Sequence, residues 1–162
     1  IGYTLSWTNR QFENINFGEW YPYKYDRRHD ISIVFSHTIN EKWDISTTWT
    51  YGTGNAITFP QAIYLGHPSN SRWSDELSID LVESYGNRNS TRLNAYHRLD
   101  LGITHRKQKK KYERIISFGA YNAYNRKNPF FAYLSYDENG DRIARQVSLF
   151  PIIPSISYRV KF

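Results

Sequence analysis

The sequence contains no cysteine, no methionine and no long run of apolar residues. Without cysteine, the chain can form neither disulfides nor thiolate metal sites. No stretch approaches the ~18 consecutive apolar residues of a membrane-spanning helix, so we exclude that kind of span. A helical period is missing from almost the whole chain, and 73–85 is the one candidate for a short loop helix.

Aromatic residues, by contrast, make up 17% of the 162 residues. Disordered chains are poor in such residues, so the composition indicates a folded chain, and its length suffices for one ordinary domain. The first residues, IGYTLSW, already alternate between apolar and polar, with no methionine and no signal peptide in front. We therefore expect the chain to be a piece of a longer polypeptide.

Apolar and polar residues alternate along most of the chain, which is the side-chain period of a β-strand. Six strands are predicted on this basis, at 3–8, 30–39, 43–51, 98–104, 115–124 and 155–162. The facing of the strand at 115–124 stays open. Ile116 and Phe118 favour one orientation, whereas Ile115 and Tyr121 favour the other.

Two prolines, Pro151 and Pro154, precede the last predicted strand. Proline cannot donate to a strand ladder and does not belong inside a regular central strand. We therefore expect a bulge or bend there, with the regular strand confined to about 155–162. The alternation continues to Phe162, which is expected if this strand closes a barrel and pairs on both of its edges.

The connections between the predicted strands differ in length. Those at 40–42 and 105–114 are short, those at 13–26 and 61–95 are long, and DENGD at 137–141 is a tight turn with Asn-Gly chemistry. If neighbouring strands are antiparallel, the short turns lie at one end of the sheet and the long loops at the other. Two-faced strands joined in this way are typical of an outer-membrane β-barrel.

In such a barrel the alternation gives each strand an outer and an inner face. For the strand at 98–104, we expect lipid to meet Leu99, Leu101 and Ile103, and the interior to meet Arg98, Asp100 and Thr104. The predicted inner faces are mostly serine, threonine, aspartate and asparagine, whereas the water-facing side of a soluble sandwich is usually rich in lysine and glutamate.

Aromatic residues near the strand ends also favour the barrel, because membrane barrels carry aromatic girdles at both interfaces. The residues concerned are Trp43, Trp49, Tyr51 and Tyr158. The alternation also fits a soluble secreted β-sandwich that binds glycans through loop aromatics, and this remains the alternative.

The formal net charge is +6, and the clearest basic run is HRKQKKKYER at 105–114. We interpret the run as a solvated turn between two strands, with a phosphate-binding patch as the alternative. A nucleic-acid-binding sheet would gather its rings on one exposed face. Here they are spread over every strand, so no nucleic-acid partner is predicted.

Candidate catalytic groups are few. A histidine–aspartate pair could orient a base at His29–Asp30 or at His97 with Asp100, but no serine is singled out as a nucleophile. The five histidines are scattered and lack the clustering of a metal site. We predict no catalytic residue, no metal and no cofactor.

Three runs carry a resemblance to a known family: LNAYHRLDLGI (93–103), SFGAYNAYNRKNPFF (117–131) and VSLFPIIPSISYRVKF (147–162). They resemble the C-terminal end of TonB-dependent outer-membrane receptors, in particular the large transporters of Bacteroidota. GNAITFP (54–60) is similar to the strand end that precedes a long external loop in that family. The resemblance covers nearly the whole chain.

The resemblance implies an all-β fold in which residues 1–162 form about six strands of an antiparallel, 22-stranded transmembrane β-barrel. The plug domain and the earlier strands would lie outside this chain. The implied function is energised uptake of a scarce nutrient across the outer membrane of a Gram-negative bacterium. The implied partners are the lipid bilayer, lipopolysaccharide, the remainder of the same receptor polypeptide, the TonB complex, the barrel-assembly machinery and a surface lipoprotein.

Two sets of site residues follow from the resemblance. The signal read by the assembly machinery would consist of Tyr158, Val160 and Phe162. The ligand contacts expected from this segment are the loop residues Trp20, Tyr21, Tyr23, Tyr25, Arg27 and Arg28. An ordered loop whose rings stack only on their neighbours is the alternative for the second set.

Overall fold

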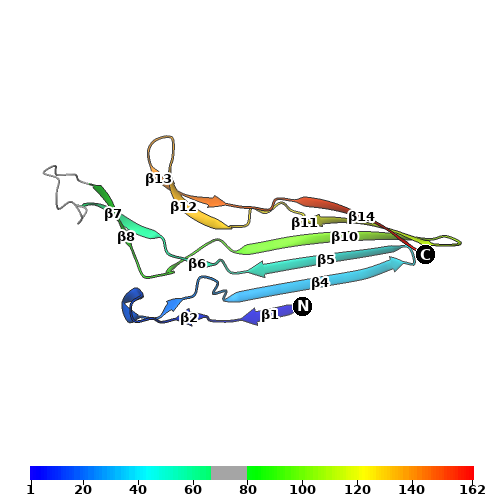
Figure 1. The fold of residues 1–162 in the computed structure, drawn as a ribbon, viewed down its shortest axis with the longest axis horizontal. Coiled ribbons are helices and arrows are strands. Elements are labelled where there is room, and N and C mark those ends of the chain that lie inside the picture. Colours follow the sequence, from blue (N-terminus) through cyan, green and yellow to red (C-terminus); the bar gives the residue numbers. More distant parts are fainter. Residues whose placement is uncertain (67–79) are drawn as a thin grey trace. The chain divides into compact units, whose positions relative to one another are not determined.

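The computed structural model describes residues 1–66 and 80–162, and these form antiparallel β-sheets (Figure 1). The strands are β1 Gly2–Leu5, β2 Asn9–Arg10, β3 Tyr21–Pro22, β4 His29–Asn40, β5 Trp43–Gly52, β6 Ala56–Ile57, β7 Pro60–Gly66, β8 Asp80–Tyr85, β9 Thr91–Arg92, β10 Tyr96–Gln108, β11 Glu113–Tyr121, β12 Phe131–Tyr136, β13 Arg142–Val147 and β14 Ile153–Lys161. Helical structure in these residues is limited to the 3₁₀ turn η1, Asn16–Gly18. None of it is long and apolar enough to cross a bilayer.

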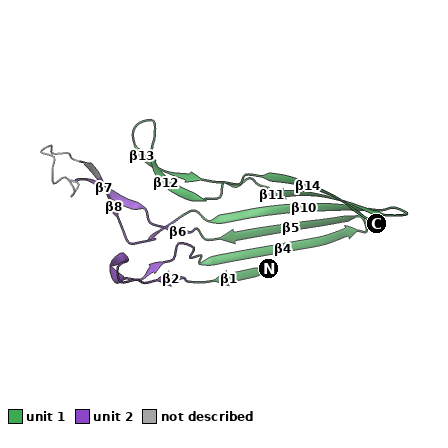
Figure 2. Cartoon of the chain, viewed as in Figure 1, with its two compact units in different colours: residues 1–6, 27–54, 93–162 green, residues 7–26, 55–92 purple. Residues whose placement is uncertain are grey.

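The chain divides into two compact units (Figure 2). Unit 1 comprises Ile1–Ser6, Arg27–Gly54 and Leu93–Phe162, and unit 2 comprises Trp7–Asp26 and Asn55–Arg92. Unit 1 contains a six-stranded sheet and the separate β12–β13 hairpin, whereas unit 2 contains the two-stranded pairs β2–β3, β6–β9 and β7–β8. The described parts of the predicted long connections therefore contain strands of their own.

The six-stranded sheet has the order β1-β4-β5-β10-β11-β14, and every neighbouring pair is antiparallel. All six predicted strands are found in it, although their bounds differ. The two short turns connect β4 to β5 and β10 to β11, and we call this the short-turn end. The chain leaves for unit 2 from the opposite end, where Leu5 pairs with His29 and Gly52 pairs with Tyr96. We call this the long-loop end.

The register places the apolar residues of neighbouring strands on the same face. Leu101 lies between Thr47 of β5 and Ala120 of β11, and Ile103 lies between Ile45 and Phe118. Since side chains alternate along a strand, Arg98, Asp100 and Thr104 lie on the other face. The predicted assignment of β10 residues to two faces therefore agrees with the register.

The facing of β11, which the sequence leaves open, is decided by its neighbours. Ile116 pairs with His105 and Phe118 pairs with Ile103, so both lie on the apolar face. Ile115 and Tyr121 consequently lie on the polar face.

Two predictions about local structure are wrong. Residues 80–85, placed in a candidate loop helix, form strand β8, while 73–79 lie outside the described residues. Pairing with β7 gives this segment backbone hydrogen bonds that an isolated short helix could barely maintain. In β14 the strand begins at Ile153 and includes Pro154 in regular register, without the expected bulge. The proline is accommodated because Pro154 is the second residue of β14, where the loss of one ladder donor leaves the rest of the strand paired.

The basic run is mostly strand, where the sequence predicts a turn. Strand β10 continues to Gln108 and β11 begins at Glu113, so only residues 109–112 make the turn, closed by the Lys109 N–H donating to the Tyr112 carbonyl at 2.8 Å. The DENGD turn is confirmed between β12 and β13, with Gly140 at φ +84°. Glycine adopts that left-handed conformation without steric cost.

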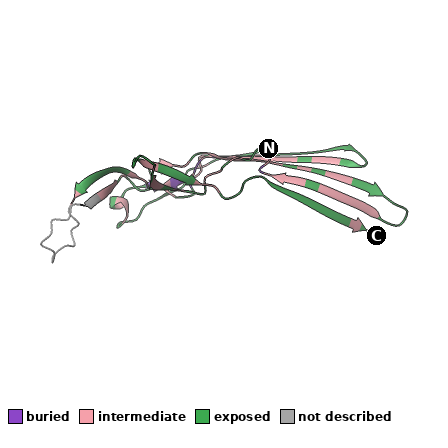
Figure 3. Ribbon diagram, turned by 90° about the horizontal axis from the view of Figure 1, so that it is seen from above, coloured by how far each residue is buried: buried purple, intermediate pink, exposed green. Residues whose placement is uncertain are grey.

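Unit 1 has almost no hydrophobic core. The buried hydrophobic residues of the described chain are Tyr21 and Ala56, and both belong to unit 2. Large apolar side chains of the six-stranded sheet are exposed instead, as Phe35 at 50%, Phe118 at 49% and Ile156 at 71% show. Figure 3 accordingly shows the sheet strands coloured as intermediate or exposed along nearly all of their length. The sheet is a single layer whose apolar face has no protein layer on it within unit 1.

Candidate functional site

The main surface of unit 1 is the apolar face of the six-stranded sheet. Its side chains belong to five adjacent strands and follow the cross-strand register. They are Ile33 and Phe35 of β4, Ile45, Thr47 and Trp49 of β5, Leu99, Leu101 and Ile103 of β10, Ile116, Phe118 and Ala120 of β11, and Ile156 and Tyr158 of β14. Apolar side chains that meet across strands stabilise the pairing, but they leave this face in need of an apolar cover.

The middle of the apolar face is hollowed. A cavity of about 590 Å³ lies over β4, β5, β10 and β11, and its lining includes Phe35, Leu101, Ile103 and Phe118. The depth arises because the two residues paired with Leu101 are the small Thr47 and Ala120. The volume is within the range of small-molecule pockets, but the lining is almost entirely apolar, so it suits a hydrocarbon group.

Aromatic rings mark both ends of the apolar face. At the short-turn end Trp43 pairs with His105, and their ring centroids are 4.5 Å apart. At the long-loop end Trp49 and Tyr51 stack at 6.1 Å, and Tyr51 pairs with His97. Trp43 and Tyr51 are eight residues apart, which is about 27 Å along a strand. With a strand tilt of about 40°, that length spans about 21 Å of height, near the ~25 Å apolar band of outer-membrane barrels.

The opposite face of the sheet is polar and made of short side chains. One row across five strands consists of Ser36, Ser46, Gly102, Gly119 and Ser155, and the next consists of Thr38, Asp44, Thr104, Ser117 and Ser157. Within the second row the Thr38 hydroxyl donates to Asp44 at 2.8 Å, and the Thr104 and Ser117 hydroxyls lie 3.0 Å apart. The polar side chains in these two pairs therefore find hydrogen-bond partners on the neighbouring strand.

Four charged residues of the polar face form two ion pairs. Arg106 contacts the Asp44 carboxylate at 2.9 Å near the short-turn end. Nearer the long-loop end, Arg98 donates to Asp100 at 2.9 Å, to the Tyr96 hydroxyl at 2.9 Å and to the Tyr121 hydroxyl at 2.7 Å. This Arg98 cluster compensates the charges of Arg98 and Asp100 on this face.

The segment after β11 is held by a buried asparagine that is not among the sequence-predicted site residues. Asn122 is fully buried, and its amide nitrogen donates to the carbonyls of Arg126 and Phe150 at 2.9 and 3.0 Å. Its backbone N–H donates to Asp100 Oδ1 at 2.9 Å, which attaches this segment to β10. Asn122 and Asn125 have φ of +53° and +55°. Asparagine tolerates this conformation, so the repeated asparagines of NAYNRKN were the available signal.

The candidate histidine–aspartate pairs are not formed. His97 Nδ1 lies 2.7 Å from the hydroxyl of Tyr124, while Asp100, on the other face, is engaged by Arg98 and Asn122. His29 Nδ1 likewise lies 2.9 Å from the Tyr3 hydroxyl. Partial burial raises the pKa of the Tyr124 phenol, so that group stays protonated at neutral pH. No cluster of three or more candidate metal ligands occurs in residues 1–66 and 80–162.

The six predicted ligand-binding residues belong to both units. Trp20, Tyr21, Tyr23 and Tyr25 lie in unit 2, whereas Arg27 and Arg28 lie in unit 1. Tyr21 is only 5% exposed, which leaves it little surface for a ligand. Trp20 and Tyr25 are the exposed members, at 66% and 59%.

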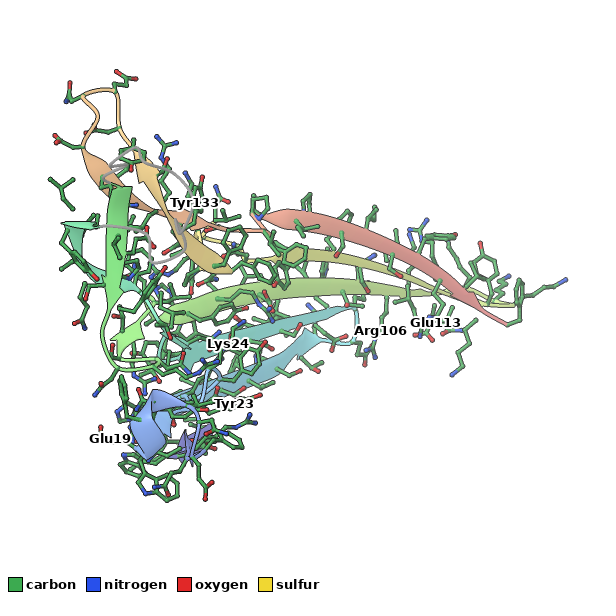
Figure 4. All side chains as sticks on the ribbon, turned by 60° about the vertical axis from the view of Figure 1, so that its left-hand side comes forward. Glu19, Tyr23, Lys24, Arg106, Glu113 and Tyr133 are labelled. Atoms are coloured by element: carbon green, nitrogen blue, oxygen red, sulfur yellow. The ribbon has the colours of Figure 1, made fainter. Side chains whose placement is uncertain are left out.

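Cationic side chains cover some of these rings. The Arg10 guanidinium lies 3.7 Å from the centroid of Tyr23, and Arg88 lies 5.6 Å from that of Tyr21. Figure 4 labels Tyr23 beside Lys24. In unit 1 the Arg27 guanidinium lies 5.5 Å from the Tyr96 ring centroid. Tyr21 and Tyr23 thus pack as the alternative for this loop predicts. Tyr25 is also partly covered, because the Tyr23 ring and the Lys24 ammonium each lie 5.5 Å from its ring centroid. Trp20 is the most exposed of the four rings.

The two segments of unit 2 are joined by polar contacts between residues that are not among the sequence-predicted site residues. Asp26 is fully buried, accepts the Thr8 N–H at 2.6 Å and forms an ion pair with Arg92. The Asn89 amide donates to the Pro22 carbonyl at 2.8 Å. No sequence pattern indicates a pairing such as Asp26 with Arg92, because the partners are 66 residues apart.

A second group of exposed rings lies on the β12–β13 hairpin. The Phe131 ring is 5.8 Å from Phe130 and 6.0 Å from Tyr133, and all three residues are exposed. Tyr133, labelled in Figure 4, pairs in register with Arg145 of β13. The aromatic run NPFFAYLSY was the signal available in the sequence.

The predicted assembly-signal residues lie on or beside β14. Tyr158 pairs with Ile116 and Val160 with Arg114, which places both on the apolar face. Phe162 follows the strand, is 97% exposed and has its ring 6.3 Å from Tyr112.

No protein-family model, curated protein sequence or solved structure matches the chain.

Proposed function

We propose that residues 1–162 form part of a transmembrane β-barrel in a bacterial outer membrane. In this proposal the apolar face of the six-stranded sheet contacts lipid, and the polar face lines the barrel interior. The observation that carries it is a single-layer sheet whose apolar face is exposed and bounded by aromatic rows at both ends. Contiguous apolar patches of this extent on a protein surface mark an interaction site, and lipid is the partner that fits such a banded face.

The polar face supports the same proposal. Its serine, threonine and glycine rows suit a barrel interior, which is polar in membrane barrels. The exterior of a soluble sheet commonly carries long charged side chains, and here the charged groups Arg98, Asp100, Asp44 and Arg106 are paired with one another.

Strands β1 and β14 are at the edges of the sheet and leave backbone groups unpaired in this chain. Exposed edges are avoided in native proteins, and within a bilayer every backbone group needs a partner. Six strands are too few to close, since even eight leave an interior only just wide enough for side chains. We propose that the remainder of the same polypeptide supplies the neighbouring strands.

The proposed activity follows from the resemblance to TonB-dependent receptors. The complete protein would import a scarce nutrient with energy delivered by the TonB complex, after insertion by the barrel-assembly machinery. Trp20 and Tyr25 are the most exposed of the candidate rings for a ligand. A strain lacking the protein should then show the same growth defect on the transported nutrient as a strain lacking the TonB complex.

The alternative, a soluble β-sandwich, needs a second sheet over the apolar face. The other sheets in the described part of the chain are two-stranded pairs. The second layer of a sandwich would therefore have to come from outside the described residues.

A labelling experiment tests the lipid-facing surface. Leu101→Cys and Thr104→Cys are made separately in the full-length protein that carries this segment, labelled with a fluorophore and reconstituted in vesicles whose acyl chains are brominated. Bromine quenches only fluorophores in contact with the chains, so Leu101 should be quenched and Thr104 should not. Quenching at Thr104 alone would reverse the assigned faces. Absence of quenching at both positions would contradict the proposed membrane location.

The isolated chain offers a second test. If the six strands require neighbours, sedimentation of residues 1–162 in detergent should show aggregates or partner-bound species. A well-folded monomer would contradict the barrel-segment proposal and favour an independent sheet domain.

A further inference from the structure

At the short-turn end the apolar face continues into two basic residues. Lys107 of β10 and Arg114 of β11 are direct cross-strand partners, and Arg114 also pairs with Val160 of β14. Two residues further into the sheet, the same face carries His105 and Ile116. The alternation that puts Leu101, Ile103 and Phe118 on this face therefore puts Lys107 and Arg114 there as well.

This basic pair has no acidic partner across the strands. Glu113, the nearest carboxylate along β11, belongs to the polar face and pairs in register with Gln108 and Lys161. The Nε of Arg114 is enclosed and has no hydrogen-bond partner among the described residues. The adjacent turn adds three more positive charges and no negative charge, at Lys109, Lys110 and Lys111. The end of the apolar face is thus suited to an anion.

The spacing between the basic pair and the hollow fits a lipid. Lys107 and Leu101 are six residues apart, which is about 20 Å along an antiparallel strand and, at a strand tilt of about 40°, about 16 Å of height. One leaflet of a bilayer has a hydrocarbon layer of about 15 Å. An acyl chain whose headgroup lies at Lys107 and Arg114 would therefore run past Trp43 and Ile103 and reach the cavity between Leu101 and Phe118.

We propose that this surface binds an anionic glycerophospholipid, with its phosphate held by Lys107 and Arg114 and one acyl chain in the hollow. The inference rests on the proposed membrane location and adds a lipid class and a binding position to it. A guanidinium matches the phosphate oxygens with several donors, and the ammonium adds a second charge. The apolar lining of the hollow is what distinguishes this ligand from a free phosphate or a nucleic acid.

Membrane integration is measured first, as resistance of the full-length protein to alkaline extraction. The detergent-solubilised protein is then titrated with palmitoyl-oleoyl phosphatidylglycerol, and retained lipid is counted by native mass spectrometry. The test variant is Lys107→Gln with Arg114→Gln. The matched control is Lys110→Gln with Lys111→Gln, which removes the same charge from the turn.

We expect the test variant to weaken phosphatidylglycerol binding by about thirtyfold, since each basic residue near anionic headgroups contributes roughly fivefold. The control should retain most of the binding, and phosphatidylcholine should bind weakly to all variants. Thr47→Phe, which fills the hollow, should also weaken binding although both basic residues are intact.

Other outcomes would overturn the inference in distinct ways. Equal losses in the test and control variants would mean diffuse attraction to a basic turn. Displacement by millimolar glycerol 3-phosphate would mean a site for a free anion, and tighter binding of purified lipid A would assign the surface to lipopolysaccharide. If the unaltered protein is not integrated in membranes, the proposed function fails and the inference fails with it. If integration is normal and the variants bind alike, the inference alone fails.

Discussion

Arg98 contacts Tyr121 in two ways. Its Nη1 donates a 2.7 Å hydrogen bond to the phenol oxygen, and its guanidinium carbon lies 4.1 Å from the centroid of the ring. The two residues come from neighbouring strands β10 and β11 and lie on the polar face of the sheet. The charge of Arg98 is therefore accommodated on the polar face by the ring of Tyr121, which the sequence pattern could not assign to a face.

Substitutions of Tyr121 should separate the two contacts. Tyr121→Phe removes the hydrogen bond and keeps the ring, so the free energy of unfolding should fall by about 1–2 kcal/mol. Tyr121→Leu removes both contacts and should cost about 1 kcal/mol more. Urea unfolding in detergent measures both values. Equal losses for the two variants would show that the ring contact contributes nothing.

Asn122 should be sensitive to both its hydrogen bonds and its backbone conformation. Asn122→Gly and Asn122→Ala lose the same side-chain hydrogen bonds, but only alanine is strained at φ +53°. Alanine should therefore be less stable than glycine by about 1 kcal/mol. The comparison uses urea unfolding of both variants. If alanine were the more stable of the two, the left-handed conformation assigned to this position would be wrong.

The Asp26–Arg92 pair should stabilise unit 2 locally. Asp26→Asn keeps an acceptor for the Thr8 N–H but loses the ion pair with Arg92. This loss should destabilise unit 2 by about 2 kcal/mol. The cost is smaller than for a fully buried ion pair because the Arg92 side chain is 30% exposed. Amide hydrogen exchange should accelerate in residues 7–26 and 55–66. Amides of β5 and β10, in unit 1, serve as the internal control. Uniform acceleration throughout both units would contradict a local role.

Arginine substitutions should report the facing of β10. Leu101→Arg places a charge on the proposed lipid face and should cost about 2–4 kcal/mol if the position is near the bilayer midplane. Thr104→Arg, on the polar face beside Ser117, should be tolerated far better. The measurement is the yield of full-length protein in outer-membrane fractions. Normal yield for Leu101→Arg, together with loss for Thr104→Arg, would invert the assigned faces.

Phe162 should matter for assembly more than for stability. Its side chain is 97% exposed in the chain, so Phe162→Ala removes few contacts. If the ring belongs to the assembly signal, the variant should reach the membrane in much lower amounts, while the barrels that do assemble unfold at an unchanged temperature. Heat-modifiability on gels gives both quantities. A normal yield with a lowered unfolding temperature would make Phe162 a packing residue.

Much of the six-stranded sheet is predictable from the sequence. The strict alternation of Trp43–Tyr51 and of Leu99–Ile103 assigns a face to each residue before any partner is known, because side chains two apart share a face. The lengths of the connections likewise predict which strand ends lie together at the short-turn end and which at the long-loop end. The strand bounds are less accurate, since β10 continues through polar residues as far as Gln108, held there by its pairing with β11.

Other features were decided only by tertiary structure. Ile115 and Ile116 are both apolar, so only the pairing of β11 with β10 and β14 determines which of them joins the apolar face. Residues 80–85 become a strand because β7 pairs with them. Asp26 and Arg92, or Asn122 and Phe150, meet across long stretches of chain, and neither partner carries a local signal of the other. Alternation involves only neighbouring residues, so the sequence alone determines it. Cross-strand partners and the hollow beside Leu101 depend on which distant segments the folded chain brings together.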